Sequence, residues 1–164
     1  MSVFDFTDAA HPVEIAFFDR GPLDASTLIT GGYWSTYWYN GFIYGAEMAR
    51  GLDVLRLTAS AQLSQAELDA ASLVQVERFN VQHQDRVTWP AHPTVARAYL
   101  AQLERGQALA PARVAAVRAW LDAEPSAVGT LTTQLRADAA AASGADATRL
   151  DALAGTLDGI ANGR

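Results

Sequence analysis

Residues 33–45 decide the fold, and they read Tyr-Trp-Ser-Thr-Tyr-Trp-Tyr-Asn-Gly-Phe-Ile-Tyr-Gly. Aromatic and small polar residues alternate up to Asn40, as in a strand whose two faces are differently solvated. Asn40-Gly41 is a strong hairpin signal, because Asn and Gly tolerate the positive φ that a type I′ turn requires at both central positions. The segment therefore predicts a strand over residues 33–39 and a return strand over residues 42–45.

Three further β-prone segments flank this hairpin. Residues 3–6 and 13–18 are separated by a segment with turn chemistry, and residues 51–57 follow the hairpin. In the last of them we expect Leu52 and Val54 to point inward. Together with the hairpin, these segments predict an antiparallel meander of about five strands.

The period of the apolar residues changes to that of helices from residue 63 onward. Ser64-Gln-Ala-Glu67 fits a capping box at the start of a helix. Pro93 and Pro111 each open another helix, and two more helices are expected in the tail, the first beginning near Ser126. The sequence predicts the α+β class, with an antiparallel β-meander in residues 1–60 followed by an α-helical bundle in residues 61–164.

Composition excludes several kinds of partner. The chain has 18 acidic and 12 basic residues and a net charge of -6, which disfavours nucleic-acid binding. No apolar run approaches the roughly 18 residues that cross a bilayer, and the N-terminal residues lack the pattern of a signal peptide. There is no cysteine. We therefore expect neither nucleic-acid binding nor membrane insertion, and the chain has no disulfide.

Residues 31–57 resemble the closing region of LVIVD-repeat proteins, a family of bacterial β-propellers. The resemblance lies in a strand that ends at Asn40-Gly41, a second strand that contains Tyr44, and a third that begins Gly-Leu-Asp-Val at residues 51–54. Residues 4–16 resemble the sequence segment that connects strands in this family. The helical part is similar to the tails that follow the propeller in some actinobacterial members.

The resemblance implies a terminal propeller blade within residues 1–60 and a family often associated with the cell surface, so the parent protein is expected to be exported or surface-bound. A propeller needs about four to eight blades, and roughly 60 residues supply little more than one. We therefore expect a C-terminal fragment whose partners are the missing blades, or a second copy bound through unpaired sheet edges. The resemblance implies no established reaction and no cofactor. The expected function is a non-catalytic structural or interaction module with a helical cap.

Glu47, Arg50 and Asp53 form the first candidate site, between and within the last two strands. Two acids beside an arginine are able to bind a cation or a polar ligand, and the chain would then be part of a ligand-binding or hydrolytic propeller. The alternative, which we favour, is a turn with a solvated ion pair, because surface ion pairs are common and contribute little.

Trp34, Trp38 and Tyr44 are the candidate ligand-binding residues of the aromatic segment. Exposed aromatic rings stack on sugars, which would make the chain a surface carbohydrate binder. We favour the alternative that these rings fill packing faces.

Catalytic and metal-binding motifs are not recognised. His83, Asp85 and His92 match no ligand spacing, and no serine lies in a nucleophile-elbow motif. We expect neither a catalytic residue nor a metal site.

Overall fold

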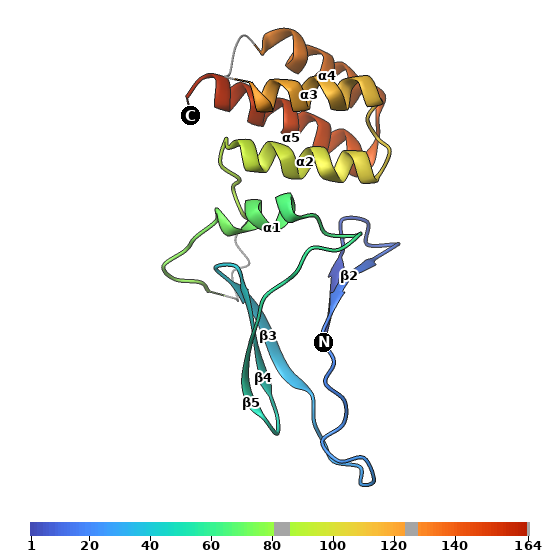
Figure 1. Ribbon diagram of the computed structural model, residues 1–164, viewed down its shortest axis with the longest axis vertical. Coiled ribbons are helices and arrows are strands. Elements are labelled where there is room, and N and C mark those ends of the chain that lie inside the picture. Colours follow the sequence, from blue (N-terminus) through green and yellow to red (C-terminus); the bar gives the residue numbers. More distant parts are fainter. Residues whose placement is uncertain (81–85, 124–127, 164) are drawn as a thin grey trace. The chain divides into compact units, whose positions relative to one another are not determined.

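The computed structural model describes residues 1–80, 86–123 and 128–163. It has the α+β composition that the sequence predicts, with five strands followed by five helices among the described residues (Figure 1). The chain forms two compact units, Met1–Val87 and Thr88–Arg164. The first helix therefore belongs to the same unit as the strands, whereas the proposed domain division near residue 60 remains a prediction.

The strands form two antiparallel sheets. β1 (Ser2–Asp5) pairs with β2 (Val13–Phe17), and the second sheet has the order β3 (Tyr33–Tyr39), β4 (Phe42–Glu47), β5 (Gly51–Leu55). The five expected strands are present, but they do not form one continuous meander. Between β2 and β3 the chain runs through a long loop, so these two strands are not paired.

The hairpin predicted at Asn40-Gly41 is confirmed. Asn40 has a φ of 47° and Gly41 a φ of 89°, and Tyr39 pairs with Phe42 across the turn. The next connection is a three-residue loop over residues 48–50, and it is followed by Gly51, the first residue of β5, at a φ of 90°. Both turns thus place the residues that accept positive φ where the backbone demands it.

The three-stranded sheet has two different faces, which follow from its register. The side that we call the outer face carries Tyr37, Tyr39, Phe42, Tyr44, Ala46, Leu52 and Val54. The opposite side, which we call the inner face, carries Tyr33, Trp38, Ile43, Gly45, Glu47, Asp53 and Leu55. Ile43, Gly45 and Glu47 are buried on the inner face. A Cβ built on Gly45 would lie 3.1 Å from the Met1 methyl group, so the start of the chain covers this face.

The expectation that Leu52 and Val54 point inward is wrong. Leu52 pairs with Ala46 and Val54 with Tyr44, on the outer face, where they are 67% and 52% exposed. Successive side chains of a strand point to opposite faces. Asp53, which is held on the inner face by hydrogen bonds, therefore turns its two apolar neighbours outward.

The first three helices begin at the capping serine and the two prolines that the sequence predicts. α1 (Gln65–Ser72) starts at Ser64 with both hydrogen bonds of the capping box. α2 (Pro93–Arg105) and α3 (Pro111–Asp122) each have proline in the first turn, as expected. α4 (Gly129–Ala141) begins after the expected position, and that position, Ser126, lies outside the described residues.

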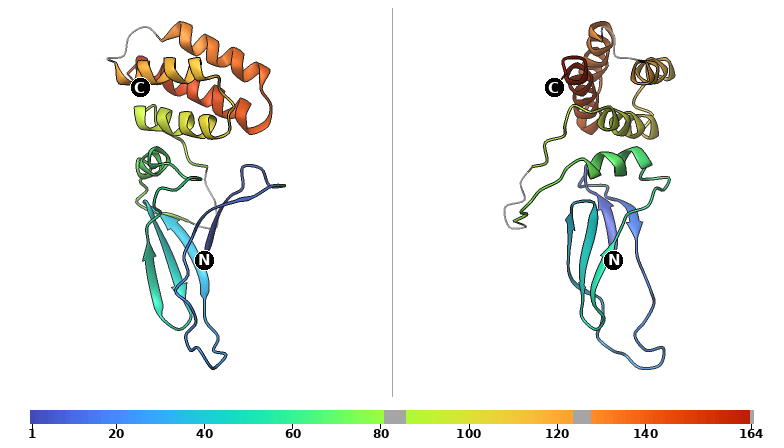
Figure 2. Two further views of the ribbon diagram at one scale, coloured as in Figure 1. Left: turned by 45° about the vertical axis from the view of Figure 1, so that its right-hand side comes forward. Right: turned by 60° about the vertical axis from the view of Figure 1, so that its left-hand side comes forward.

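The helical unit builds its own hydrophobic core. α5 (Gly144–Ala161) packs against both α2 and α4 (Figure 2). Its leucines at 150, 153 and 157 are fully buried. They meet Leu103 of α2 and Leu135 of α4, each also fully buried. No helix in the described part of the chain is long and apolar enough to cross a membrane.

Candidate functional site

Glu47 is buried at the end of β4, where its carboxylate accepts three backbone hydrogen bonds. The Gly32 amide donates to Oε1 at 2.7 Å, and the amides of Ala49 and Arg50 donate to Oε2. The hydrogen bond from Gly32 is the main reason why the pKa of Glu47 lies below its usual value, with smaller contributions from the two turn amides. Glu47 thus joins the start of β3 to the β4–β5 turn.

Asp53 lies on the same face and is also engaged within the protein. The Tyr33 hydroxyl donates to its Oδ2 at 2.5 Å, and the Arg20 guanidinium donates to the same oxygen. These contacts, the Tyr33 hydrogen bond first, lower the pKa of Asp53, while burial is the main cause that raises the pKa of Tyr33. The network attaches the loop before β3 to β5.

The Arg50 side chain bonds to a loop carbonyl, although the Arg50 backbone amide bonds to Glu47. Its side chain is exposed and donates to the Pro22 carbonyl at 3.1 Å. Arg50 and Glu47 line one cleft of about 490 Å³, together with Arg20 and Tyr33 and the loop over residues 18–32. Asp53 is not among the residues that line this cleft, but it bonds to Arg20 and Tyr33, which do line it.

The chemistry of this trio differs from that of a solvated ion pair. The turn is present as expected, but Glu47 is only 6% exposed and bonds to amides, and the ion pair of Asp53 is with Arg20. Both carboxylates accept hydrogen bonds from internal donors, and Arg50 is the exposed member of the trio. In this geometry the carboxylates of Glu47 and Asp53 therefore hold loops in place.

The three candidate aromatic residues do not meet in one site. Trp34 lies at a bulge in the β3–β4 pairing and is 81% exposed. Trp38 belongs to the inner face and lines a second cleft, of about 550 Å³, formed with α1. Tyr44 lies on the outer face, where its ring centroid is 6.3 Å from that of Tyr39 and 6.5 Å from that of Phe42.

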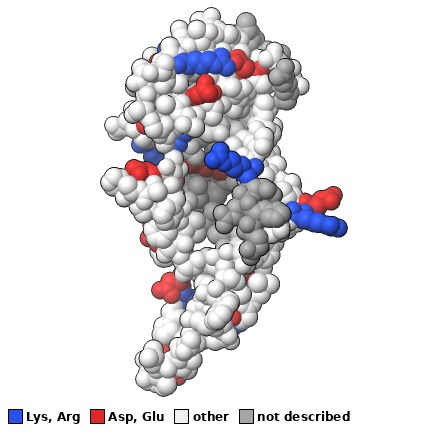
Figure 3. Space-filling view, turned by 180° about the vertical axis from the view of Figure 1, so that it is seen from behind, with Lys and Arg blue, Asp and Glu red and all other residues white. Residues whose placement is uncertain are grey.

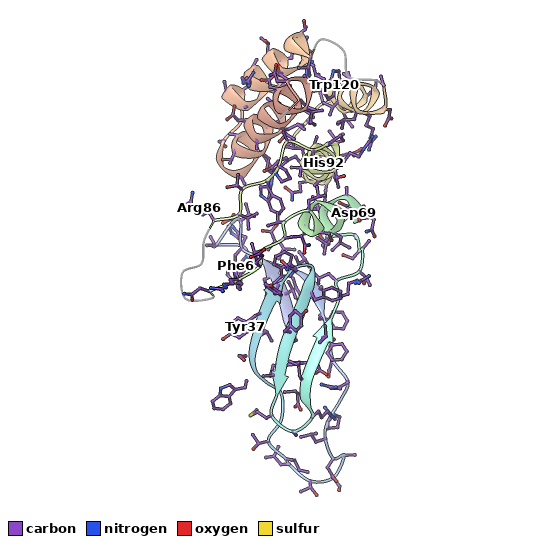
Figure 4. All side chains as sticks on the ribbon, turned by 90° about the vertical axis from the view of Figure 1, so that its left-hand side faces the viewer. Phe6, Tyr37, Asp69, Arg86, His92 and Trp120 are labelled. Atoms are coloured by element: carbon purple, nitrogen blue, oxygen red, sulfur yellow. The ribbon has the colours of Figure 1, made fainter. Side chains whose placement is uncertain are left out.

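The outer face contains one of the candidate residues, Tyr44, and further exposed side chains that were not candidates. Tyr37, Leu52 and Val54 lie on it, each about half exposed or more, and Tyr37 projects away from the sheet (Figure 4). The rings at its hairpin end are better covered, since the Tyr39 hydroxyl donates to the Val76 carbonyl at 2.9 Å. The signal was available in the sequence, because residues at every second position of three paired strands share a face.

The histidines provide no metal site among the described residues, where no group of three metal-binding side chains gathers. His92 caps α2, its Nδ1 accepting from the Thr94 amide at 3.2 Å. His83 and Asp85 lie outside the described residues. On the side of the molecule seen in Figure 3, acidic and basic side chains are interspersed and neither sign gathers in a patch.

Comparisons with known proteins found no match: no family model, no curated protein and no solved structure corresponds significantly to this chain.

Proposed function

We propose that this chain is a non-catalytic structural and interaction module, the terminal portion of an LVIVD-type β-propeller scaffold that also carries a helical domain. The observation that supports this proposal best is the uncovered outer face of the β3–β4–β5 sheet. Tyr37 is 46% exposed there, Leu52 67% and Val54 52%. Large apolar side chains gathered on one exposed sheet face are typical of surfaces that pack against another protein surface.

The internal hydrogen bonds support the same function. The described carboxylates of the candidate site hold loops, through the Gly32 amide at Glu47 and the Tyr33 hydroxyl at Asp53. Such bonds stiffen the sheet and its turns, so that the outer face is presented on a fixed scaffold. A preorganised face loses less entropy on binding than a mobile one.

Sedimentation velocity over a range of concentrations tests this proposal. We expect the wild-type chain to associate as its concentration rises, and Tyr37→Asp to weaken that association because it places a charge in the apolar face. The matched control is Trp34→Asp, which alters an exposed aromatic at the bulge. Circular dichroism checks that both variants fold. A wild type that stays monomeric at every concentration, or an unchanged Tyr37→Asp, would contradict the proposal.

The cleft beside Arg50 favours a second candidate function, the binding of a small polar ligand. Arg50 and Arg20 line the cleft along with the apolar side chains of Leu23 and Ile29. Because Glu47 and Asp53 are already bonded, Arg50 would provide the main contact. Calorimetric titration of the wild type and of Arg50→Gln with a panel of small carboxylates and sugars tests this alternative. It requires that one of these ligands binds the wild type and that Arg50→Gln abolishes the binding.

A further inference from the structure

We infer that β5 is a self-pairing edge, at which two copies of this chain join antiparallel into one six-stranded sheet. The inference rests on the proposed interaction function and names its partner. β5 is the last strand of the order β3-β4-β5, and among the strands of the described residues it pairs with β4 alone (Figure 1). A strand in this position presents unpaired N–H and C=O groups, which another strand of the same kind satisfies.

The β5 edge is the most regular of the strand edges described. Its register with β4 is continuous over all five residue pairs, from Gly51 to Leu55. The β3 edge is interrupted by the bulge at Trp34, and the β1–β2 pairing shifts register between Val3 and Phe4. Bulges increase twist and turn an edge away from further pairing, so the regular β5 edge is the one suited to strand addition.

β5 has one charged side chain, and this side chain is engaged inside the protomer. Proteins guard edges with lysine, proline or inward-pointing charges, and this strand contains neither lysine nor proline. Its one charged residue is Asp53, which is already bonded to Tyr33 and Arg20. Pairing with Arg20 inside the same protomer weakens the repulsion between this charge and a neighbouring strand.

A second copy fits the edge because the strand is self-complementary. A two-fold axis at Val54 places this β-branched residue opposite itself and Asp53 opposite Leu55 of the other copy. An axis at Asp53 would set two like charges opposite each other, which is unfavourable. The axis at Val54 also leaves the outer faces of both copies on one side, so that Tyr44 and Val54 of each copy form a continuous apolar stripe.

The size of the contact sets its strength. With the axis at Val54, residues 53–55 out of the five residues of β5 pair with β5 of the other copy, whereas a standard interface involves about 20 to 30 residues on each side. Strand pairing alone therefore gives a weak dimer that dissociates on dilution. The wild type is expected to shift from monomer to dimer as concentration rises.

Single-cysteine cross-linking in the full chain tests the inference, since the chain has no cysteine of its own. Directly opposite residues of antiparallel strands have Cα atoms about 4.5–5.5 Å apart, within the range of about 4.4–6.8 Å that a disulfide spans. We expect Val54→Cys to form a disulfide-linked dimer under mild oxidation. The matched control is Tyr44→Cys, one strand further in, whose two copies would be separated by about three strand spacings of about 4.8 Å each and would not cross-link.

The outcomes separate this inference from the proposed function. A linked dimer with Val54→Cys, none with Tyr44→Cys, and slower hydrogen exchange of β5 amides at high concentration support edge pairing. A cross-link at Tyr44→Cys with none at Val54→Cys shows association through the outer face, which overturns the inference and leaves the proposed function standing. Absence of both cross-links in a chain that stays monomeric overturns the two together.

Discussion

The helical unit and the β-unit use their apolar residues in opposite ways. Leu135, Leu150 and Leu153 are fully buried inside the helical unit, while Leu52 and Val54 are more than half exposed in the β-unit. A helix satisfies its own backbone, so packing one apolar stripe against its neighbours completes the structure. A sheet has two faces and two edges, and a small sheet of three strands does not cover all of these surfaces by itself. The difference locates the capacity for interaction in the β-unit.

The largest expected effect comes from removing the same side chain in each unit. Leu153→Ala leaves a cavity in the α2–α4–α5 core, and we expect a loss of about 2–5 kcal/mol in the free energy of unfolding. Leu28→Ala alters a side chain of the β-unit that is fully exposed, and its effect should stay within about 0.5 kcal/mol. Denaturant unfolding followed by far-ultraviolet circular dichroism measures both. Equal losses would contradict the contrast between the units.

Adding one methyl group should have opposite signs in the two units. A Cβ at Gly45 would lie 2.5 Å from the Tyr33 ring, which is held by its hydrogen bond to Asp53. Gly45→Ala is therefore expected to destabilise by about 1–3 kcal/mol through overpacking. Gly155 of α5 has open space around its Cβ position, so Gly155→Ala should stabilise by about 0.5–1 kcal/mol, the helix preference for alanine. Thermal unfolding of the two variants tests the sign of each change.

Acid should weaken the β-unit through its two engaged carboxylates. Glu47 and Asp53 have pKa values lowered from the ordinary 4.5 and 3.8. When the pKa of a carboxyl group is lower in the folded protein than in the unfolded chain, its contribution to stability is complete at pH values above the unfolded-state pKa. This contribution is lost as the pH falls through the folded-state pKa. The loss is thus expected below about pH 4.5. Hydrogen exchange at the Gly32 and Ala49 amides reports it.

A matched pair of variants assigns this acid sensitivity. Glu47→Gln removes the charge that accepts the three amides, so these amides should exchange faster at neutral pH and change less on acidification. Glu14→Gln, at an exposed position on β2, should leave their exchange unchanged. Exchange at Gly32 that is the same in Glu47→Gln and the wild type would contradict the role given to this carboxylate.

Local chemistry explains why much of the fold followed from the sequence. The strand over residues 33–39, the turn at Asn40-Gly41 and the cap at Ser64 depend on neighbours within a few positions, and all three are confirmed. The division into two sheets did not follow, because it depends on how the loop between β2 and β3 runs. Turn signals in that loop mark irregular backbone, and they do not say which strands pair.

The candidate site shows the same limit. The sequence placed Glu47, Arg50 and Asp53 near one turn, which is correct, but it could not supply their partners. Gly32 and Arg20 come from a loop distant in sequence, and they convert an apparent ion pair into two separate hydrogen-bonded anchors. The aromatic candidates were chosen by residue type, whereas register decides their face and so separates Trp38 from Tyr44.

The smallest expected effect compares two serines at helix starts, one in each unit. Ser64 caps α1, its hydroxyl accepting from the Glu67 amide at 3.3 Å, while Ser143 precedes α5 without a side-chain capping bond. Ser64→Ala should therefore cost about 0.5–2 kcal/mol, and Ser143→Ala close to nothing. Chemical denaturation of both variants provides the comparison. A larger loss for Ser143→Ala than for Ser64→Ala would contradict the difference between the two caps, because Ser143 makes no side-chain capping bond that the substitution could remove.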